Sequence, residues 1–124
     1  MSDRLALLIW AATPDRPELV VAPLVHALAA LALDAEVEIH FAGPAVRWLV
    51  CGVAENAWPT PEREKCVAAF LNEVAANGGQ YFACGMAQAV WVGATERLRA
   101  DAGAAGATAF VARALDPAWT TLVY

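Results

Sequence analysis

The sequence of 124 residues lacks the features of several large classes of protein. It has only 8 Lys and Arg residues against 13 Asp and Glu, contains no basic run, and carries a net charge of −5. We therefore do not expect nucleic-acid binding, which needs clustered positive charge. No apolar run reaches the ~18 residues of a membrane span, because Pro23 and His26 interrupt the longest one, residues 19–33. Residues 1–4 lack the basic segment and cleavage site of a signal peptide, so we expect a cytoplasmic protein that does not bind membranes.

The motifs of many enzymes and cofactor-binding proteins are missing as well. The sequence has no GxGxxG, P-loop, HExxH, CxxC or GxSxG motif. Its only serine is Ser2, which argues against a Ser-His-Asp hydrolase. The three cysteines and two histidines, at positions 26, 40, 51, 66 and 84, include no pair at the short spacing of metal ligands. We therefore expect no metal and no other cofactor, and in a reducing cytoplasm the cysteines would be free thiols.

Apolar residues, in contrast, are abundant. They make up 60% of the sequence and include five tryptophans, whereas an average soluble domain is about 45–50% apolar. A single domain of this length cannot bury all of that surface. We therefore expect self-association, because exposed apolar patches usually mark interfaces. The alternative is a monomer with an alanine-rich surface.

Segments typical of strands and helices alternate along the chain. This alternation predicts one α/β domain over residues 1–124, with a mostly parallel sheet of four to five strands. The expected strands are residues 5–12, 36–42, 80–84 and 119–124, with a poorly marked fifth between residues 88 and 106. The expected helices are residues 18–33, 62–76, 94–102 and 107–115, with one or two helical turns at residues 45–53.

Local signals suggest where some of these elements begin and how they are covered. Asp15 and Thr60 are candidate N-caps, and Pro23 should kink the first helix or delay its regular start. In the second expected strand, Glu38 and His40 alternate with apolar residues. This pattern indicates a strand near a sheet edge with one face in water, so we expect His40 to be exposed.

One cysteine has a position that suggests chemistry. Cys84 ends the third expected strand and is followed at once by Gly85, and ligand sites of parallel sheets lie at the carboxyl ends of strands. A thiolate is a nucleophile, and its pKa falls near a helix N-terminus; residues 86–92 could open such a helix or form an ordered loop. The alternative is a buried, inert cysteine. Cys66 is expected to be a small core residue, and Cys51 either acts as a resolving thiol or packs under a short helix.

Four segments of the chain carry a family resemblance: LLIWAATPDRP, VEIHFAGPAVRWL, the unit NGGQYFACGMA, and GATAFVARALDPAWTTLVY. Together they resemble the DsrE/DsrF-like family of sulfur-relay proteins, which includes the Tus-type sulfur carriers. The resemblance implies a three-layer α/β/α sandwich with a five-stranded parallel sheet, assembled into trimers or hexamers. It also implies that Cys84 is the family's reactive cysteine, which carries a persulfide in the sulfur-transferring members. Residues 85–93 contain no Arg or Lys, although active members commonly have basic residues there.

Our leading hypothesis is a homo-oligomeric protein in which Cys84 takes sulfane sulfur from a donor and passes it to an acceptor protein. The backbone N–H groups of Gly85 and Met86 would stabilise the charged sulfur. The loops at Thr13 and Gly43, which follow the first two strands, would line the same edge of the sheet. Two alternatives use the same fold without turnover: a module that binds a small apolar or anionic ligand, and an interaction protein.

Overall fold

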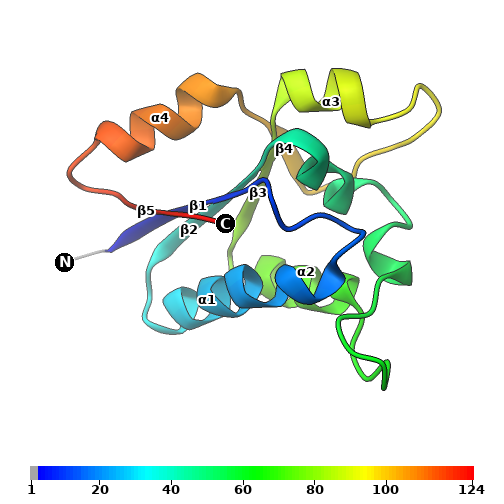
Figure 1. Cartoon of the computed structure of the whole chain (residues 1–124). Helices are drawn as coiled ribbons and strands as arrows, with labels where there is room; N and C mark the ends of the chain where they lie inside the picture. Colours follow the sequence, from blue (N-terminus) through cyan, green and yellow to red (C-terminus); the bar gives the residue numbers. More distant parts are fainter. Residues whose placement is uncertain (1–2) are drawn as a thin grey trace.

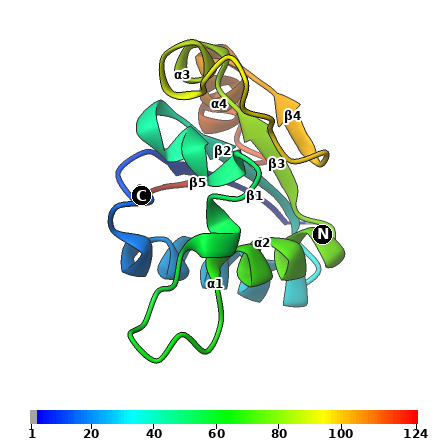
Figure 2. The ribbon, with the colours of Figure 1, turned by 90° about the vertical axis from the view of Figure 1, so that its right-hand side faces the viewer.

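A parallel five-stranded sheet forms the centre of the computed structural model, which describes residues 3–124 (Figure 1). The strand order is β4-β3-β2-β1-β5. Helices α1 and α2 cover one face, and α3 and α4 lie on the other (Figure 1, Figure 2), which confirms the expected three-layer α/β/α sandwich. Ser2 lies outside the described residues.

The strands are β1 (Arg4–Ile9), β2 (Glu36–Phe41), β3 (Gln80–Ala83), β4 (Ala102–Ala104) and β5 (Thr120–Val123). The α-helices are α1 (Val21–Ala32), α2 (Val67–Ala76), α3 (Gly85–Trp91) and α4 (Ala107–Leu115), and the 3₁₀ helices are η1 (Pro17–Leu19), η2 (Gly43–Leu49) and η3 (Ala54–Asn56).

The fifth strand lies in the interval where a poorly marked one was expected. β4 is only three residues long and pairs with β3 in parallel, with Gly103 opposite Phe82. A Cβ atom on Gly103 would come within 3.2 Å of the Phe82 ring. The strand is therefore built from small residues that carry no hydrophobic pattern, which explains its weak signal in the sequence.

β2 lies inside the sheet, between β1 and β3, so the prediction of an edge position is wrong. Glu38 and His40 are only 4% and 5% exposed, and the expected solvent exposure of His40 is wrong as well. The strand register places Leu8, His40 and Phe82 side by side on three neighbouring strands. Helix α4 covers this face through Phe110, whose ring centroid lies 5.4 Å from that of His40.

The two faces of the sheet are packed unequally. On the side of α1 and α2, the Tyr81 hydroxyl donates to the Leu71 carbonyl of α2 (2.6 Å). At the carboxyl edge of the sheet, the buried Trp48 indole N–H of η2 donates to the Ala12 carbonyl (2.7 Å). Burial raises the pKa of the Tyr81 phenol, so it stays a neutral donor. Helix α4, on the opposite face, has no buried residue. The fully buried apolar residues include Leu7, Ile9, Leu24, Ile39 and Phe41.

Helix α1 begins at Val21, later than the predicted start at residue 18. Pro23 falls in its first turn, where a missing N–H costs no helical hydrogen bond, so the expected delay of the helix is found. Asp15 does not cap it: no side chain bonds to the N-terminus of α1 or of the preceding η1. No helix within residues 3–124 is long and apolar enough to span a membrane.

Helix α2 begins at Val67 and not at residue 62, and Thr60 makes no capping bond to it. Residues 57–66 form a loop that extends beyond the layer of α1 and α2 (Figure 2). The Val67 N–H donates to the Ala57 carbonyl (2.9 Å) and so closes the loop at the start of the helix. The backbone of Arg63 has a positive φ of 53°, which a continuous helix could not contain.

The predicted polar helix at residues 94–102 is wrong. This segment instead pairs with the chain that follows η2: Cys51 N donates to Arg97 O and Arg99 N donates to Leu49 O, both at 2.8 Å. Backbone groups satisfied by a neighbouring segment are not available for a helix. The expected helical turns at residues 45–53 are present as η2.

Candidate functional site

Cys84 joins β3 to α3 at the carboxyl edge of the sheet. Its backbone is extended, its N–H donates to Phe41 O (3.1 Å), and its carbonyl accepts from Gln88 N (2.9 Å). The first bond extends the pairing of β3 with β2, and the second starts α3. Cys84 is therefore the N-cap residue of a seven-residue helix, and its side chain is half-buried.

A cavity of about 180 Å³ opens beside this thiol. Its walls come from the ends of β1 and β2, from the chain that follows β3, and from the start of α4. The lining is almost wholly apolar, and Cys84 and His40 are the only described residues in it whose side chains contain sulfur or nitrogen. The wall residues that matter here are Leu8, His40, Phe41, Cys84, Phe110 and Val111.

His40 belongs to a buried charged cluster. Its Nε2 lies 3.1 Å from Glu38 Oε1, and Arg113 of α4 donates to both oxygens of the same carboxylate, Nε to Oε1 at 3.1 Å and Nη2 to Oε2 at 2.9 Å. The ring of His40 stacks on Phe82 with centroids 5.1 Å apart, and the Arg113 guanidinium lies 4.2 Å from the Trp119 ring. The cluster thus ties α4 to the middle of the sheet.

The pKa values of the cluster follow from burial and from these bonds. Burial opposes ionisation of Glu38, but the hydrogen bonds and charges of Arg113 and His40 together outweigh it and hold the pKa of Glu38 below its ordinary value. Burial also opposes charge on His40 and lowers its pKa, although Glu38 partly offsets that effect. At neutral pH the cluster therefore contains a carboxylate, a guanidinium and a neutral imidazole.

The comparisons with known proteins agree with this fold. A model of the DsrE/DsrF-like family matches residues 6–123. The chain belongs to this family. The crystal structure of the YchN protein from E. coli is similar over 100% of both chains, with a TM-score of 0.77 and 13% sequence identity, a level at which the likeness shows the fold alone. A search of curated proteins found no match.

The four other predicted site residues lie outside the cavity that Cys84 lines. Gly43 (φ +54°) follows β2 and opens η2, and Thr13 follows β1 and donates to the Asp15 carboxylate. Gly85 begins α3, and Met86 is 81% exposed. Thr13, Gly43, Gly85 and Met86 all lie near the carboxyl edge, but none of them lines the cavity.

The two other cysteines are separate from this cavity. Cys51 is exposed, so the prediction that it packs under a short helix is wrong. Cys66 is half-buried at the N-cap position of α2, where it packs against the main core. Neither lines the cavity beside Cys84.

Sequence reasoning missed the cluster of Glu38, His40 and Arg113. The spacing of Glu38 and His40 predicts correctly that both side chains share one face of β2, but the prediction that this face is exposed to water is wrong. Arg113 lies 75 positions beyond Glu38, and nothing in the local pattern connects the two. Arg113 brings a positive charge from α4 to the cluster, where it is paired with Glu38, and it does not line the cavity beside Cys84.

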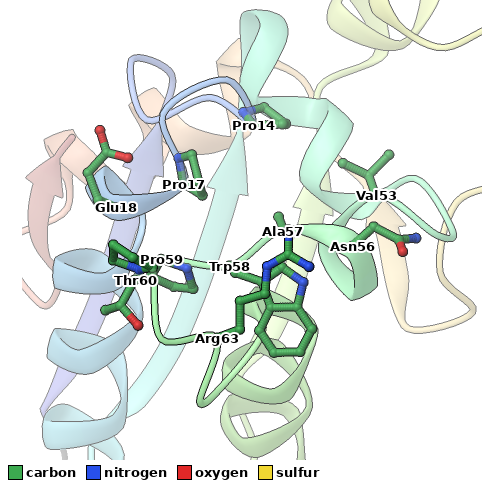
Figure 3. Close-up of a pocket in the computed structure, with 11 residues that line it drawn as sticks. Pro14, Pro17, Glu18, Val53, Asn56, Ala57, Trp58, Pro59, Thr60 and Arg63 are labelled. Carbon is green, nitrogen blue, oxygen red and sulfur yellow. The ribbon is translucent and has the colours of Figure 1, made fainter.

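A larger hollow of about 710 Å³ lies elsewhere, between the loop before α1 and the loop before α2 (Figure 3). Its lining includes Pro14, Pro17, Trp58 and Arg63, and none of its residues also lines the cavity beside Cys84. The groove is broad and open, and it contains neither a cysteine nor a histidine. The smaller cavity is the candidate site because it combines a thiol with a buried titratable group.

Proposed function

We propose that this DsrE/DsrF-like protein carries sulfane sulfur as a persulfide on Cys84 and passes it to the thiol of an acceptor protein. The observation that carries the proposal is the position of Cys84, between β3 and α3, on the wall of a partly enclosed apolar cavity. A persulfide reacts readily with thiols and oxidants in solution. A cavity that limits access of solvent would therefore protect it until the acceptor binds. Membership of the DsrE/DsrF-like family supports a sulfur-relay role, and free thiols fit the expected reducing cytoplasm.

The chemistry is an exchange of sulfur between thiols. The Cys84 thiolate attacks the outer sulfur of a donor persulfide, the donor's S–S bond breaks, and its inner sulfur leaves as a thiolate that takes up a proton. An acceptor thiolate then attacks the outer sulfur of Cys84 and releases the Cys84 thiolate. Sulfane sulfur moves intact through both steps, so neither an oxidant nor a reductant is consumed.

Backbone groups at the start of α3 support a charged sulfur. The first N–H groups of a helix have no partner within it, and at the start of α3 these belong to Gly85, Met86 and Ala87. They would stabilise the negative charge of a thiolate or persulfide on Cys84. The roles proposed for Gly85 and Met86 thus require only their backbone N–H groups, which fits the position of both residues outside the cavity wall.

We also propose that the protein is a homo-oligomer, with a trimer or hexamer as the family resemblance implies. Helices α3 and α4 carry large apolar side chains in water, among them Met86, Val90, Trp91, Val111 and Leu115. Val111 lines the cavity beside Cys84 and also an open groove along α4. Subunit contact over α4 would bury this surface and restrict access to the cavity.

A second candidate function is binding of a small apolar ligand without turnover. The apolar walls of the cavity favour it, as does the lack of Arg and Lys in residues 85–93. An interaction protein that only assembles a complex is the third candidate, and the exposed apolar side chains of α3 and α4 favour it.

Intact mass spectrometry separates the first function from the others. The protein is incubated with sodium tetrasulfide or with glutathione persulfide, alongside Cys84→Ser and the matched controls Cys51→Ser and Cys66→Ser. We expect a gain of one sulfur atom that thiol reductants remove, present in wild type and both controls and lost in Cys84→Ser. A gain that survives in Cys84→Ser would refute the assignment to Cys84, and no gain in wild type with either donor would favour binding or assembly.

A further inference from the structure

His40 is placed between the Cys84 cavity and the buried ion pair. It is 5% exposed, it lines the cavity, and its Nε2 is bonded to Glu38. Its ring is held by Phe82 on one side and by Phe110 in an edge contact. A buried histidine whose ring is fixed on three sides has one orientation, and here that orientation leaves part of the ring on the cavity wall.

The hydrogen bond to Glu38 determines which ring nitrogen carries the proton. Arg113 keeps Glu38 ionised, and a carboxylate can only accept. Nε2 must therefore donate, and in the neutral ring Nδ1 bears the free lone pair. Among residues 3–124, no hydrogen bond to Nδ1 is found. Trp119 Nε1 is the only buried side-chain nitrogen or oxygen atom without a partner in these residues, so Nδ1 is not fully enclosed by protein atoms. Nδ1 is therefore free to accept a proton, and the ring and Cys84 line the same cavity.

The sheet brings Cys84 to the same place. Phe82 is the strand neighbour of His40, and Cys84 lies two residues beyond Phe82 along an extended backbone. Because side chains two residues apart on a strand share a face, Cys84 and His40 both lie on the side of the sheet that α4 covers. No hydrogen bond joins the Cys84 thiol directly to His40 within the described chain. The cavity of about 180 Å³ has room for a bridging water, since one water occupies roughly 30 Å³.

We propose that His40, oriented by Glu38 and Arg113, is the proton acceptor that converts the Cys84 thiol into the attacking thiolate. The S–H bond breaks, the proton passes through a water to Nδ1, and an imidazolium and a thiolate remain. The same proton then returns to the thiolate that leaves the sulfur donor, so each transfer ends with a neutral imidazole. Glu38 and Arg113 act as positioning residues, because they fix the tautomer without touching the sulfur.

The charges around His40 define the expected pH behaviour. Glu38 on its own strand favours the imidazolium, Arg113 from α4 disfavours it, and a Cys84 thiolate next to β3 would favour it. The neighbour from β1 is Leu8, which is apolar. The thiolate and the imidazolium therefore form together, since each charge stabilises the other in apolar surroundings.

This inference deepens the proposed function, and its test does not need a sulfur donor. The rate of Cys84 alkylation by iodoacetamide is measured from pH 5 to 10 by peptide mass spectrometry, in wild type, His40→Gln and Glu38→Gln. We expect alkylation of Cys84 at pH 7 to fall ~10-fold in His40→Gln, with the midpoint moved to higher pH. In Glu38→Gln, alkylation of Cys84 at pH 7 should also fall, but by less than in His40→Gln. The exposed Cys51 is an internal control whose rate should be the same in all three proteins.

Each result bears on the inference. An unchanged Cys84 midpoint in a folded His40→Gln protein would overturn it, whether or not wild type gains sulfur. A shifted midpoint would support it even if wild type gains no sulfur, and in that case only the persulfide function would fail. If His40→Gln does not fold, His40→Phe preserves the ring contacts with Phe82 and Phe110, and the same shift is required of that variant.

Discussion

Arg113 and Glu38 form a two-pronged ion pair across 75 positions of sequence, with Nε–Oε1 and Nη2–Oε2 distances of 3.1 and 2.9 Å. The Glu38 side chain is almost fully buried, whereas that of Arg113 is 37% exposed. The pair is the main polar link between α4 and the sheet. Because the same carboxylate also binds His40, the attachment of α4 and the protonation of the candidate site depend on one residue.

Removal of Arg113 should destabilise the fold. Arg113→Met leaves the Glu38 carboxylate buried with only His40 as a partner, and we expect a loss of about 1–3 kcal/mol, less than a fully buried pair would lose because Arg113 is partly exposed. The stability of Arg113→Lys should lie between those of wild type and Arg113→Met, since an ammonium group cannot make two parallel hydrogen bonds to a carboxylate. Urea denaturation at pH 7.5 measures both.

A second variant tests the cause of that loss. If the unpaired carboxylate is responsible, Glu38→Gln combined with Arg113→Met will lose less stability than the sum of the two single changes. Arg16→Met, which removes an exposed pair with Glu18, is the control and should melt close to wild type. Additive losses would mean that Arg113 stabilises α4 through its contact with Trp119 instead.

Stability should fall as the solution becomes acidic, in two stages. Below about pH 6.5 the unfolded chain binds a proton on His40 that the folded protein resists, because the folded pKa is lowered. Glu38 also has a lowered folded pKa, so its contribution is present above pH 4.5 and is lost as the pH falls toward the folded value. Denaturation curves from pH 7.5 to 3.0 measure how the free energy of unfolding changes with pH in both stages.

Substitution assigns the two stages. In His40→Phe, the free energy of unfolding should change less between pH 7 and 5 than in wild type. In Glu38→Gln, the further loss of stability below pH 4.5 should be absent. Leu33→Gln changes an exposed, non-titrating position and should keep the wild-type slope. The same slope in wild type and His40→Phe would show that His40 titrates alike in the folded and unfolded chains.

The sequence was sufficient to predict the parts of the fold that depend on local pattern. Continuous apolar runs marked β1 and β3, and the pair Cys84-Gly85 marked the end of β3, while the sequence left open whether a helix or an ordered loop follows. The carboxyl edge of a parallel sheet then followed from topology alone. None of these inferences needed knowledge of which residues meet across the fold.

The errors have a different physical origin, because they depend on contacts between distant segments. Glu38 and His40 have the alternation typical of a strand with one face exposed to water. Their burial would be strongly unfavourable without Arg113 from α4, which pairs with the Glu38 carboxylate. Residues 94–102 have helical composition, but their backbone groups bind the chain near Leu49 and Cys51. The walls of the cavity likewise come from α4, so their composition could not be derived from residues near Cys84.

The turn before β3 supplies a test of packing. A Cβ atom on Gly79 would lie 2.4 Å from Val74 Cγ1 and 3.1 Å from the Val74 carbonyl oxygen. Because Val74 is fully buried, we expect Gly79→Ala to cost about 1–3 kcal/mol through forced movement of α2 against β3. Gly85→Ala has open space around the new methyl group and is the matched control for stability. Equal stability of the two variants would mean that the end of α2 adjusts freely.

The outward face of α4 is where we expect subunits to meet. Leu115 is 79% exposed and lies with Val111 along an open groove on this helix. Leu115→Arg should therefore reduce the mass measured by light scattering at micromolar concentration, because a buried charge without a partner opposes association. Leu33→Arg, at the far end of α1 and 78% exposed, should leave the mass unchanged.

Three results are informative for this surface. A wild-type monomer would contradict the proposed oligomer and leave the apolar face of α4 for a different protein. Dissociation by Leu33→Arg and not by Leu115→Arg would place the interface on the α1 side. If Leu115→Arg gives a folded monomer, alkylation of Cys84 should also become faster than in wild type, since the proposed contact over α4 restricts entry to the cavity that Val111 helps to line.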